Sequence, residues 1–207
     1  GFGITGDIGN YTLVSGSAAS TANITQASLS VAAPQVTKTY DGGTNATGVV
    51  TVGVLVGVGA GETVGTAATL AFSNKDAGIG NKTVTASGLA ILDSGSNDVT
   101  ANYNITYTDN TVSTINPFAV NLSGTRSYDG TANVAAGVLT MGALVGTETL
   151  ILSGAGTVVS KNVDTVKTVS PGTLTLGDGG NGGLATNYSF TGGTQIDASV
   201  EGDAIAT

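Results

Sequence analysis

Internal repetition limits what this chain of 207 residues can fold into more than any other feature of its sequence. The same anchors appear twice in the same order, with small insertions between them: Tyr40-Asp41-Gly42 with Tyr128-Asp129-Gly130, residues 53–57 with 142–146, 62–64 with 148–150, 82–84 with 167–169, and Asn102-Tyr103 with Asn187-Tyr188. The period of about 85–89 residues is too long for one coil of a solenoid, so it predicts discrete modules in tandem.

The repeat also predicts where each module begins and ends. We expect one module at residues 27–116 and a second at 117–207, with 197–207 either opening a further repeat or forming a disordered end. Residues 1–26 contain Asn-Tyr followed by Ile24, as in the later copies, and are expected to be the C-terminal strands of a preceding repeat. Pro117 supports the central boundary, because proline cannot donate to a strand ladder.

Within each module the apolar residues alternate with polar ones, which is typical of half-buried strands. Tyr103, Ile105 and Tyr107 follow this period of two, and so do Leu174 and Leu176. Clusters of Gly, Asp, Asn and Ser interrupt the strands every 8–12 residues or so, as in sandwiches and small barrels. We therefore predict an all-β chain of tandem antiparallel, immunoglobulin-like β-sandwich modules arranged end to end. The alternative is a β-grasp-like module with one short helix.

Composition excludes several classes of function. The chain has no His and no Cys, so zinc sites of the usual kind and Ser–His or Cys–His nucleophiles are not available. Only 6 basic residues face 14 acidic ones, and this net charge of −8 argues against nucleic acid as a partner. No apolar run reaches the ~18 residues of a membrane-spanning helix, so no membrane insertion is expected. We predict no catalytic residue, no cofactor and no enzyme activity.

Calcium is the metal for which the sequence offers candidates. Ca²⁺ needs six to eight oxygen ligands, and acidic turn residues are the usual source. Asp93 and Asp98 lie in one such turn and Asp178 in another. Solvated turns are the simpler interpretation of all three.

Lys82 and Lys167, each at the start of a Lys-Thr-Val run, are expected on the solvent face of a strand.

The repeated Tyr-Asp-Gly run is predicted to be a structural turn. The side chains of Asp41 and Asp129 are suited to close an Asx-turn on the backbone two residues ahead. Gly42 and Gly130 supply a positive φ without steric cost. The preceding tyrosine combines an apolar ring with a hydroxyl that ties down a neighbouring loop.

The runs Lys38-Thr39-Tyr40-Asp41-Gly42 and Arg126-Ser127-Tyr128-Asp129-Gly130-Thr131, with the Leu-Val-Gly, Lys-Thr-Val and Asn-Tyr segments that follow, resemble the YDG repeat domain. That domain occurs in tandem in large bacterial surface proteins, notably filamentous-haemagglutinin-like adhesins exported by two-partner secretion. The resemblance implies an extracellular or cell-surface location, with neighbouring repeats of a longer chain as partners. It also implies that other regions of that chain bind the host or surface ligand.

The sequence as a whole therefore predicts a non-catalytic stalk segment of an extracellular bacterial adhesin, monomeric as a fragment. Two alternatives remain at this stage. The repeat itself could be an adhesive module that binds carbohydrate, matrix protein or a like chain. Alternatively, the outward threonine pairs at residues 83–85 and 173–175 could form an ice-binding surface.

Overall fold

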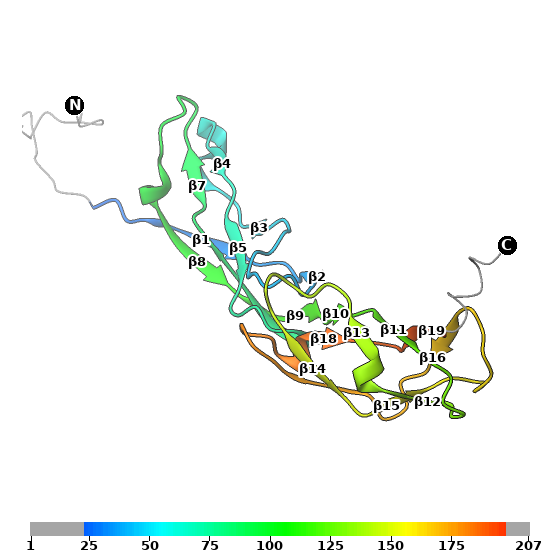
Figure 1. Ribbon diagram of the computed structural model, residues 1–207. Coiled ribbons are helices and arrows are strands. Elements are labelled where there is room, and N and C mark those ends of the chain that lie inside the picture. Colours follow the sequence, from blue (N-terminus) through cyan, green and yellow to red (C-terminus); the bar gives the residue numbers. More distant parts are fainter. Residues whose placement is uncertain (1–22, 198–207) are drawn as a thin grey trace, which may run out of the picture.

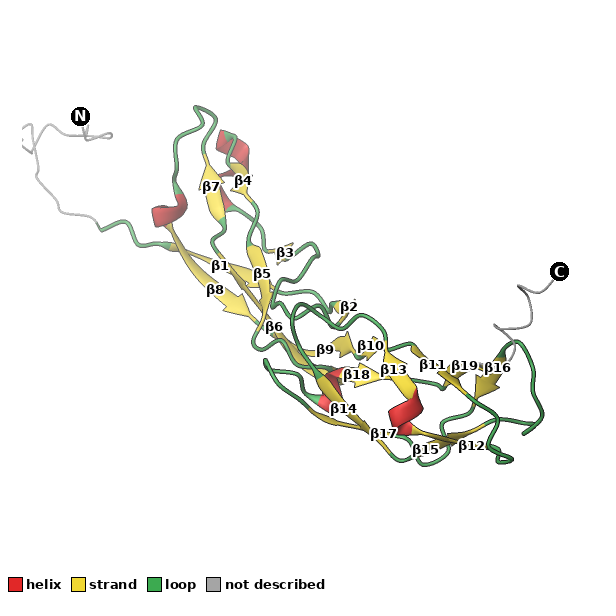
Figure 2. Ribbon diagram, viewed as in Figure 1, coloured by secondary structure: helices red, strands yellow, loops and turns green. Residues whose placement is uncertain are grey.

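The structure, a computed structural model, describes residues 23–197, and this part of the chain consists of short strands, turns and single 3₁₀ turns (Figures 1 and 2). The expected strands of a preceding repeat in 1–26 and the expected tail 197–207 lie almost wholly outside the described residues. The all-β prediction is confirmed. Among residues 23–197 the helical segments are 3₁₀ only: η1 Val56–Ala60, η2 Thr100–Asn102, η3 Ala136–Val138 and η4 Ala185–Asn187. In the same range, no helix is long and apolar enough to cross a membrane.

The first module contains nine strands, which form a sheet of order β3-β1-β8, a sheet of order β2-β9-β6-β5, and the pair β4-β7. Their bounds are β1 Ala27–Ala32, β2 Thr37–Thr39, β3 Thr51–Val52, β4 Thr63–Thr66, β5 Thr69–Phe72, β6 Gly78–Ser87, β7 Ala90–Leu92, β8 Tyr103–Thr108 and β9 Asn110–Asn116.

The second module divides its strands differently, into a sheet of order β13-β11-β19-β16 and the pairs β10-β18, β12-β15 and β14-β17. Its strands are β10 Phe118–Ala119, β11 Leu122–Arg126, β12 Asn133–Ala135, β13 Leu139–Met141, β14 Leu150–Ser153, β15 Ala155–Thr157, β16 Lys167–Val169, β17 Thr175–Asp178, β18 Tyr188–Ser189 and β19 Gly193–Asp197. Only Pro117 separates β9 of the first module from β10 of the second.

The sheets are mixed rather than purely antiparallel, which corrects one part of the predicted architecture. The opening strands of each module pair in parallel with its closing strands: β1 with β8, β2 with β9, β10 with β18, and β11 with β19. Alternation along a strand reports which face is buried and carries no information on direction. Parallel pairing lets the chain enter a module at one end and leave it at the other, and the two modules accordingly lie end to end (Figure 1).

The predicted alternation matches the burial of the side chains. In β8, Tyr103 is buried and Ile105 and Tyr107 are half-buried, while the intervening Asn104 and Thr106 are exposed.

The Lys-Thr-Val strands contradict the prediction made for their lysines. Lys82 and Lys167 are only 7% and 9% exposed, because their aliphatic stems pack inside the module. The ammonium group of Lys82 donates to Oδ1 of Asn74.

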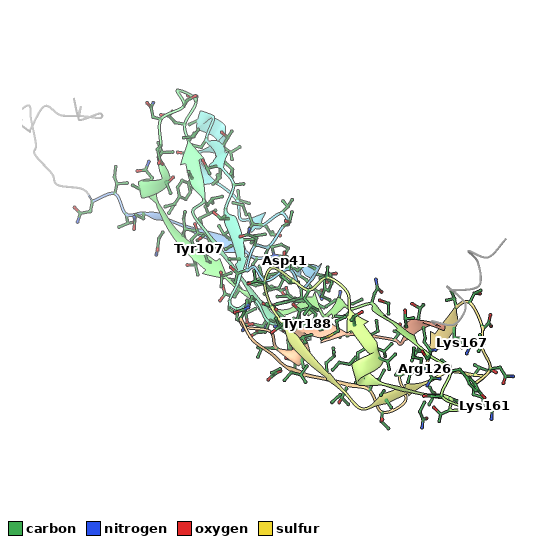
Figure 3. All side chains as sticks on the ribbon, in the orientation of Figure 1. Asp41, Tyr107, Arg126, Lys161, Lys167 and Tyr188 are labelled. Atoms are coloured by element: carbon green, nitrogen blue, oxygen red, sulfur yellow. The ribbon has the colours of Figure 1, made fainter. Side chains whose placement is uncertain are left out.

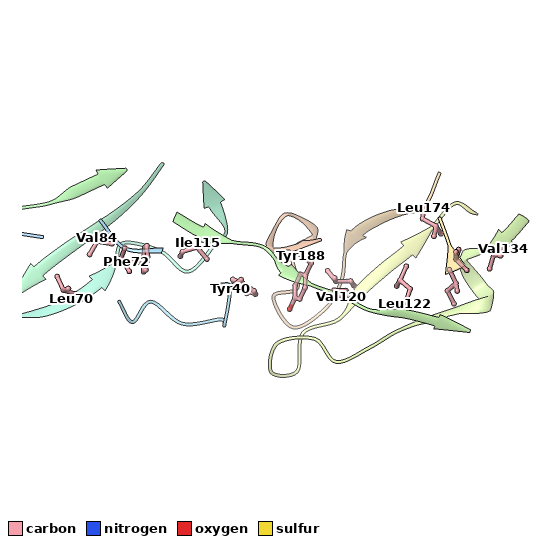
Figure 4. Close-up of a cluster of buried hydrophobic side chains, with 14 of the residues drawn as sticks. Tyr40, Leu70, Phe72, Val84, Ile115, Val120, Leu122, Val134, Leu174 and Tyr188 are labelled. Atoms are coloured by element: carbon pink, nitrogen blue, oxygen red, sulfur yellow. The ribbon is translucent and has the colours of Figure 1, made fainter. Parts of the chain in front are cut away.

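Two apolar clusters stabilise the fold. The smaller one lies in the part of the first module away from the second module and consists of Leu29, Val31, Leu55, Leu89, Ile91 and Tyr103. The larger one extends through both modules without interruption: Figure 4 shows it passing from Leu70 and Phe72 through Ile115 and Tyr188 to Val134. The two modules therefore share one core instead of each having a separate one.

The smaller cluster provides a direct test of side-chain burial in the β4–β7 pair. Ile91 of β7 is fully buried, and Val64, its partner on β4, is 40% exposed. Replacing Ile91 with Ala is expected to lower the free energy of unfolding by about 2–5 kcal/mol, the usual cost of a buried cavity. The matched change Val64→Ala is expected to cost less than about 0.5 kcal/mol. Urea unfolding followed by circular dichroism measures both, and equal losses would contradict the difference in burial between Ile91 and Val64.

Candidate functional site: the joint between the modules

The first Tyr-Asp-Gly turn has the geometry expected of it. After β2, the Asp41 carboxylate accepts hydrogen bonds from the Gly43 amide at 2.9 Å and the Lys38 ammonium at 2.7 Å. Gly42 has a φ of 77°. The Lys38 ammonium beside Asp41 holds the pKa of that carboxyl below its ordinary value. This arrangement confirms the Asx-turn interpretation.

The second copy builds the same turn with an arginine. The Asp129 carboxylate accepts from the Thr131 amide at 2.9 Å, and Arg126 Nη1 lies 2.8 Å from its other oxygen. Hydrogen bonds from the Thr131 amide and hydroxyl hold the pKa of Asp129 below its ordinary value. Arg126 also donates to the Asn133 carbonyl at 2.6 Å. The Lys-to-Arg difference between the copies therefore leaves the turn intact.

The two tyrosines of the turns, however, lie in opposite environments. Tyr40 is 1% exposed, whereas Tyr128 is 54% exposed. The Tyr40 hydroxyl donates to Oε1 of Glu148 at 2.6 Å, across a separation of 108 residues. The loop that this tyrosine ties down therefore belongs to the other module.

Glu148 is the centre of the joint between the modules. Its side chain is only 7% exposed, yet three groups donate to it. Tyr40 and the Lys75 ammonium, the latter at 3.0 Å, bind Oε1 from the first module, and Tyr188 binds Oε2 at 2.7 Å from the second. The Tyr188 hydroxyl in turn accepts from the Val145 amide at 3.1 Å. The carboxylate thus links a turn, a loop and a strand from two modules.

A second polar contact crosses the joint at Asn187, which is fully buried. Its Oδ1 accepts from the Ala77 amide at 2.7 Å, and its Nδ2 donates to the Asp76 carboxylate at 3.1 Å. A buried amide that is left unpaired costs about 1–3 kcal/mol, so these bonds require the β5–β6 loop to lie against η4.

Aromatic packing completes the joint. The rings of Tyr40 and Tyr188 meet edge to face, 5.6 Å between centroids at 72°, and Phe118 packs on Tyr188 in the same manner at 6.1 Å. Figure 3 shows Asp41 and Tyr188 where the two modules meet. The turn also comes close to Val145, because a Cβ at Gly42 would lie 3.0 Å from that side chain.

The ionisation of the joint follows from this network. Burial disfavours a charged Glu148, but hydrogen bonds from Tyr40, Tyr188 and Lys75 outweigh that cost and hold its pKa below the ordinary value of 4.5. Burial, together with the bond to Glu148, raises the pKa of Tyr188 to about 12 and also raises the pKa of Tyr40. Hydrogen bonds to Tyr40 and Glu148 raise the pKa of Lys75. Around neutral pH the centre is therefore a carboxylate with three protonated donors.

The first module contains the matching pair at its own free end. Tyr103 donates to Oε2 of Glu62 as Tyr188 donates to Glu148. It also accepts from the amides of Val56 and Gly57, at 3.0 and 3.3 Å. The Tyr–Glu pair is thus built within each module, and among the described residues it is the pair in the second module that receives donors from a neighbour.

Of the calcium candidates, Asp93 and Asp98 lie in one hairpin of the first module and Asp178 lies in the second module. Asp93 accepts from the Gly95 and Asn97 amides of its own hairpin, at 2.8 and 2.9 Å. Asp98 accepts from the Thr100 amide at 2.8 Å, and Asp178, in the other module, accepts from the Ala185 amide at 2.7 Å. Each carboxylate stabilises its own turn. Within residues 23–197, no three His, Cys, Asp or Glu side chains converge.

Sequence reasoning missed the most important residue of this site. In the sequence, Glu148 stands out only as the first residue of the repeated segment 148–150, and no pattern marks Lys75 or Asp76. A signal was present, since a glutamate recurs after Leu-Val-Gly in both copies of a chain in which charged residues make up only 10%. Its partners are distant in sequence, however, and no spacing indicated them.

The joint predicts different effects for the same substitution at the two turns. Tyr40→Phe removes a hydrogen bond to a buried carboxylate and is expected to lower the free energy of unfolding by about 1–2 kcal/mol. Tyr128→Phe removes an exposed hydroxyl and is expected to change it by less than about 0.5 kcal/mol. Urea unfolding of both variants measures the difference. Equal effects would show that the Tyr40 hydroxyl does not stabilise the joint.

The lowered pKa of Glu148 predicts that the contribution of this residue to folding stability depends on pH. A carboxyl group whose pKa is depressed by folding stabilises the folded state above its unfolded pKa, here near 4.5, and loses that contribution as the pH falls through the folded value. The wild type is therefore expected to exceed Glu148→Gln in stability at neutral pH, and the gap is expected to narrow below pH 4.5. The urea midpoints of both proteins, measured from neutral pH to below pH 4.5, give this difference in stability. A difference that does not change with pH would contradict a lowered pKa for Glu148.

Comparison with known proteins agrees with this repeated geometry. The sequence model of the YDG domain matches twice, over residues 25–114 and 111–196. No curated protein matches the chain. No solved structure matches it either. Because the two matches together cover most of the sequence, the chain belongs to the YDG domain family, of which it carries two consecutive copies.

Proposed function

We propose that this chain is a non-catalytic stalk segment of an extracellular bacterial adhesin, and that its modules hold a binding region away from the cell surface. The observation that carries the proposal is the joint itself. Tyr40, Lys75 and Asp76 of one module bind Glu148 and Asn187 of the next, so the two modules keep one relative orientation.

A fixed orientation is what a spacer needs. A flexible linker would let neighbouring modules fold back on each other, and its reach would grow only with the square root of its length. Here a single proline joins β9 to β10, and the large apolar cluster continues across the boundary. Each added module therefore adds a defined length. The composition supports the non-catalytic part of the proposal, because the chain has no His and no Cys.

The surface location is proposed on the resemblance to repeats of filamentous-haemagglutinin-like adhesins. The net charge of −8 fits a solvated rod, because like charges limit self-association along its sides.

Antibodies raised against this chain are expected to label intact cells that produce the parent protein. Labelling only after the cells are opened would contradict the location.

Direct ligand binding by the repeat is the alternative to a spacer. Sugar recognition commonly uses exposed aromatic rings, but the Tyr107 hydroxyl accepts from the Leu89 amide at 3.0 Å and its ring is half-buried. The threonines proposed for ice binding also have partners: Thr85 donates to the Ala71 carbonyl and Thr175 shares a hydrogen bond with Ser153. These contacts favour the spacer.

A replacement experiment in the parent protein separates the two functions. Residues 27–196 are exchanged for an unrelated rigid pair of β-modules of equal length, or for a Gly-Ser segment of equal residue number. Cell adhesion is expected to survive the rigid replacement and to fall with the flexible one, since only the first preserves the projection distance. Loss of adhesion with the rigid replacement would show that the repeat itself binds the ligand.

A further inference from the structure

The two ends of the described part of the chain, residues 23–197, resemble the two halves of the joint in its middle. Three residues at the joint are buried, and their counterparts in the repeat are exposed. Asn187 and Ile115 are 0% exposed, whereas Asn102 is exposed and Ile24 is 101% exposed. The same contrast separates Tyr40, which is 1% exposed, from Tyr128, which is 54% exposed.

At the end of the first module away from the joint, the counterparts of Ile115 and Asn187 line an open pocket of about 590 Å³. Its lining includes Ile24, Val56, Gly57, Glu62, Asn102 and Tyr103. Tyr103 already occupies Oε2 of Glu62, as Tyr188 occupies Oε2 of Glu148. Among the described residues, Oε1 of Glu62 has no hydrogen-bond partner, and this is the oxygen that Tyr40 and Lys75 bind on Glu148.

The opposite end of the molecule presents the complementary groups. Tyr128 follows β11 in an Asx-turn like that of Tyr40. Lys161 lies six residues before Lys167, much as Lys75 lies seven before Lys82, and the whole loop 159–166 is exposed. Figure 3 shows Lys161 at this end, beyond Arg126. Within residues 23–197, a tyrosine hydroxyl and an ammonium group are thus exposed at one end, and the pocket that contains Glu62 is open at the other.

We infer that the pocket around Glu62 and Tyr103 is a docking site for the Tyr-Asp-Gly turn of another YDG module, and that the Tyr128 turn is the matching surface for the module that follows. The incoming tyrosine and lysine bind Oε1 of Glu62, and a backbone amide of the incoming loop binds Oδ1 of Asn102. The two surfaces differ, so the contact is head to tail and builds an open linear array.

The test links two copies of the chain in the register of the internal joint. Residue 25 of the second copy follows Ile196 of the first, because Ile196 corresponds to Ile115 in the repeat. This tether gives the contact the high effective concentration that free chains lack. The second copy carries Tyr128→Phe, so only one Tyr128 remains. Nitration by tetranitromethane, followed by mass spectrometry of the peptides, then reports the exposure of that ring.

Tyr128 is expected to react at least about ten times more slowly in the linked protein than in the single chain, because the reagent reaches a buried ring only during local opening. Tyr40 should stay protected in both and serves as the control for folding. Glu62→Ala or Asn102→Ala in the second copy should restore the reactivity of Tyr128. The same changes in the first copy, whose pocket is free, should leave it protected.

Two results would overturn the inference. One is that Tyr128 reacts equally fast in the linked and single proteins while Tyr40 stays protected. The other is a protection of Tyr128 that is unaffected by Asn102→Ala in the second copy, a change at an exposed position that leaves the Tyr103–Glu62 pair in place. Either result would leave the proposed spacer function standing, since that function depends on the joint at Glu148.

Discussion

The arrangement of the whole molecule depends on one buried carboxylate. Taking the charge of Glu148 out of water is costly, and the cost is offset only while every donor is in place. Two of these donors come from the neighbouring module, so the carboxylate is fully satisfied only when the modules are correctly docked. Apolar packing alone would tolerate some sliding between the modules. Charge-assisted hydrogen bonds, which are short and directional, select one orientation.

The same logic explains why the Tyr–Glu pair is built within each module. Tyr188 fixes one oxygen of Glu148 against its own strand, and Tyr103 does the same for Glu62. The remaining oxygen is therefore oriented before a neighbour arrives, which lowers the entropic cost of docking. The Tyr-Asp-Gly turn is equally rigid, because its aspartate holds the backbone two residues ahead. Both surfaces of the joint are thus preorganised by local contacts.

The sequence predicted the local features of this fold well and the distant ones poorly. Alternation at Tyr103, Ile105 and Tyr107 correctly indicated a strand with one buried face, and the Asp-Gly pairs correctly indicated turns. Strand direction and the partners of Glu148 were missed, because both depend on segments up to 108 residues apart. Periodicity reflects the geometry of neighbouring residues only. The repeat did contain part of the missing information, since it marked Glu148 and Tyr188 as recurrent without showing that they touch.

The parallel pairing of opening and closing strands has a mechanical consequence. A chain pulled at its two ends loads the first and last strands of each module in opposite directions along their length. Six consecutive residue pairs join β1 to β8, and five join β11 to β19. Under such a load these ladders are sheared, so their hydrogen bonds resist together instead of opening one at a time as in a hairpin that is unzipped. A protein built in this way withstands tension best along the axis on which its modules are stacked.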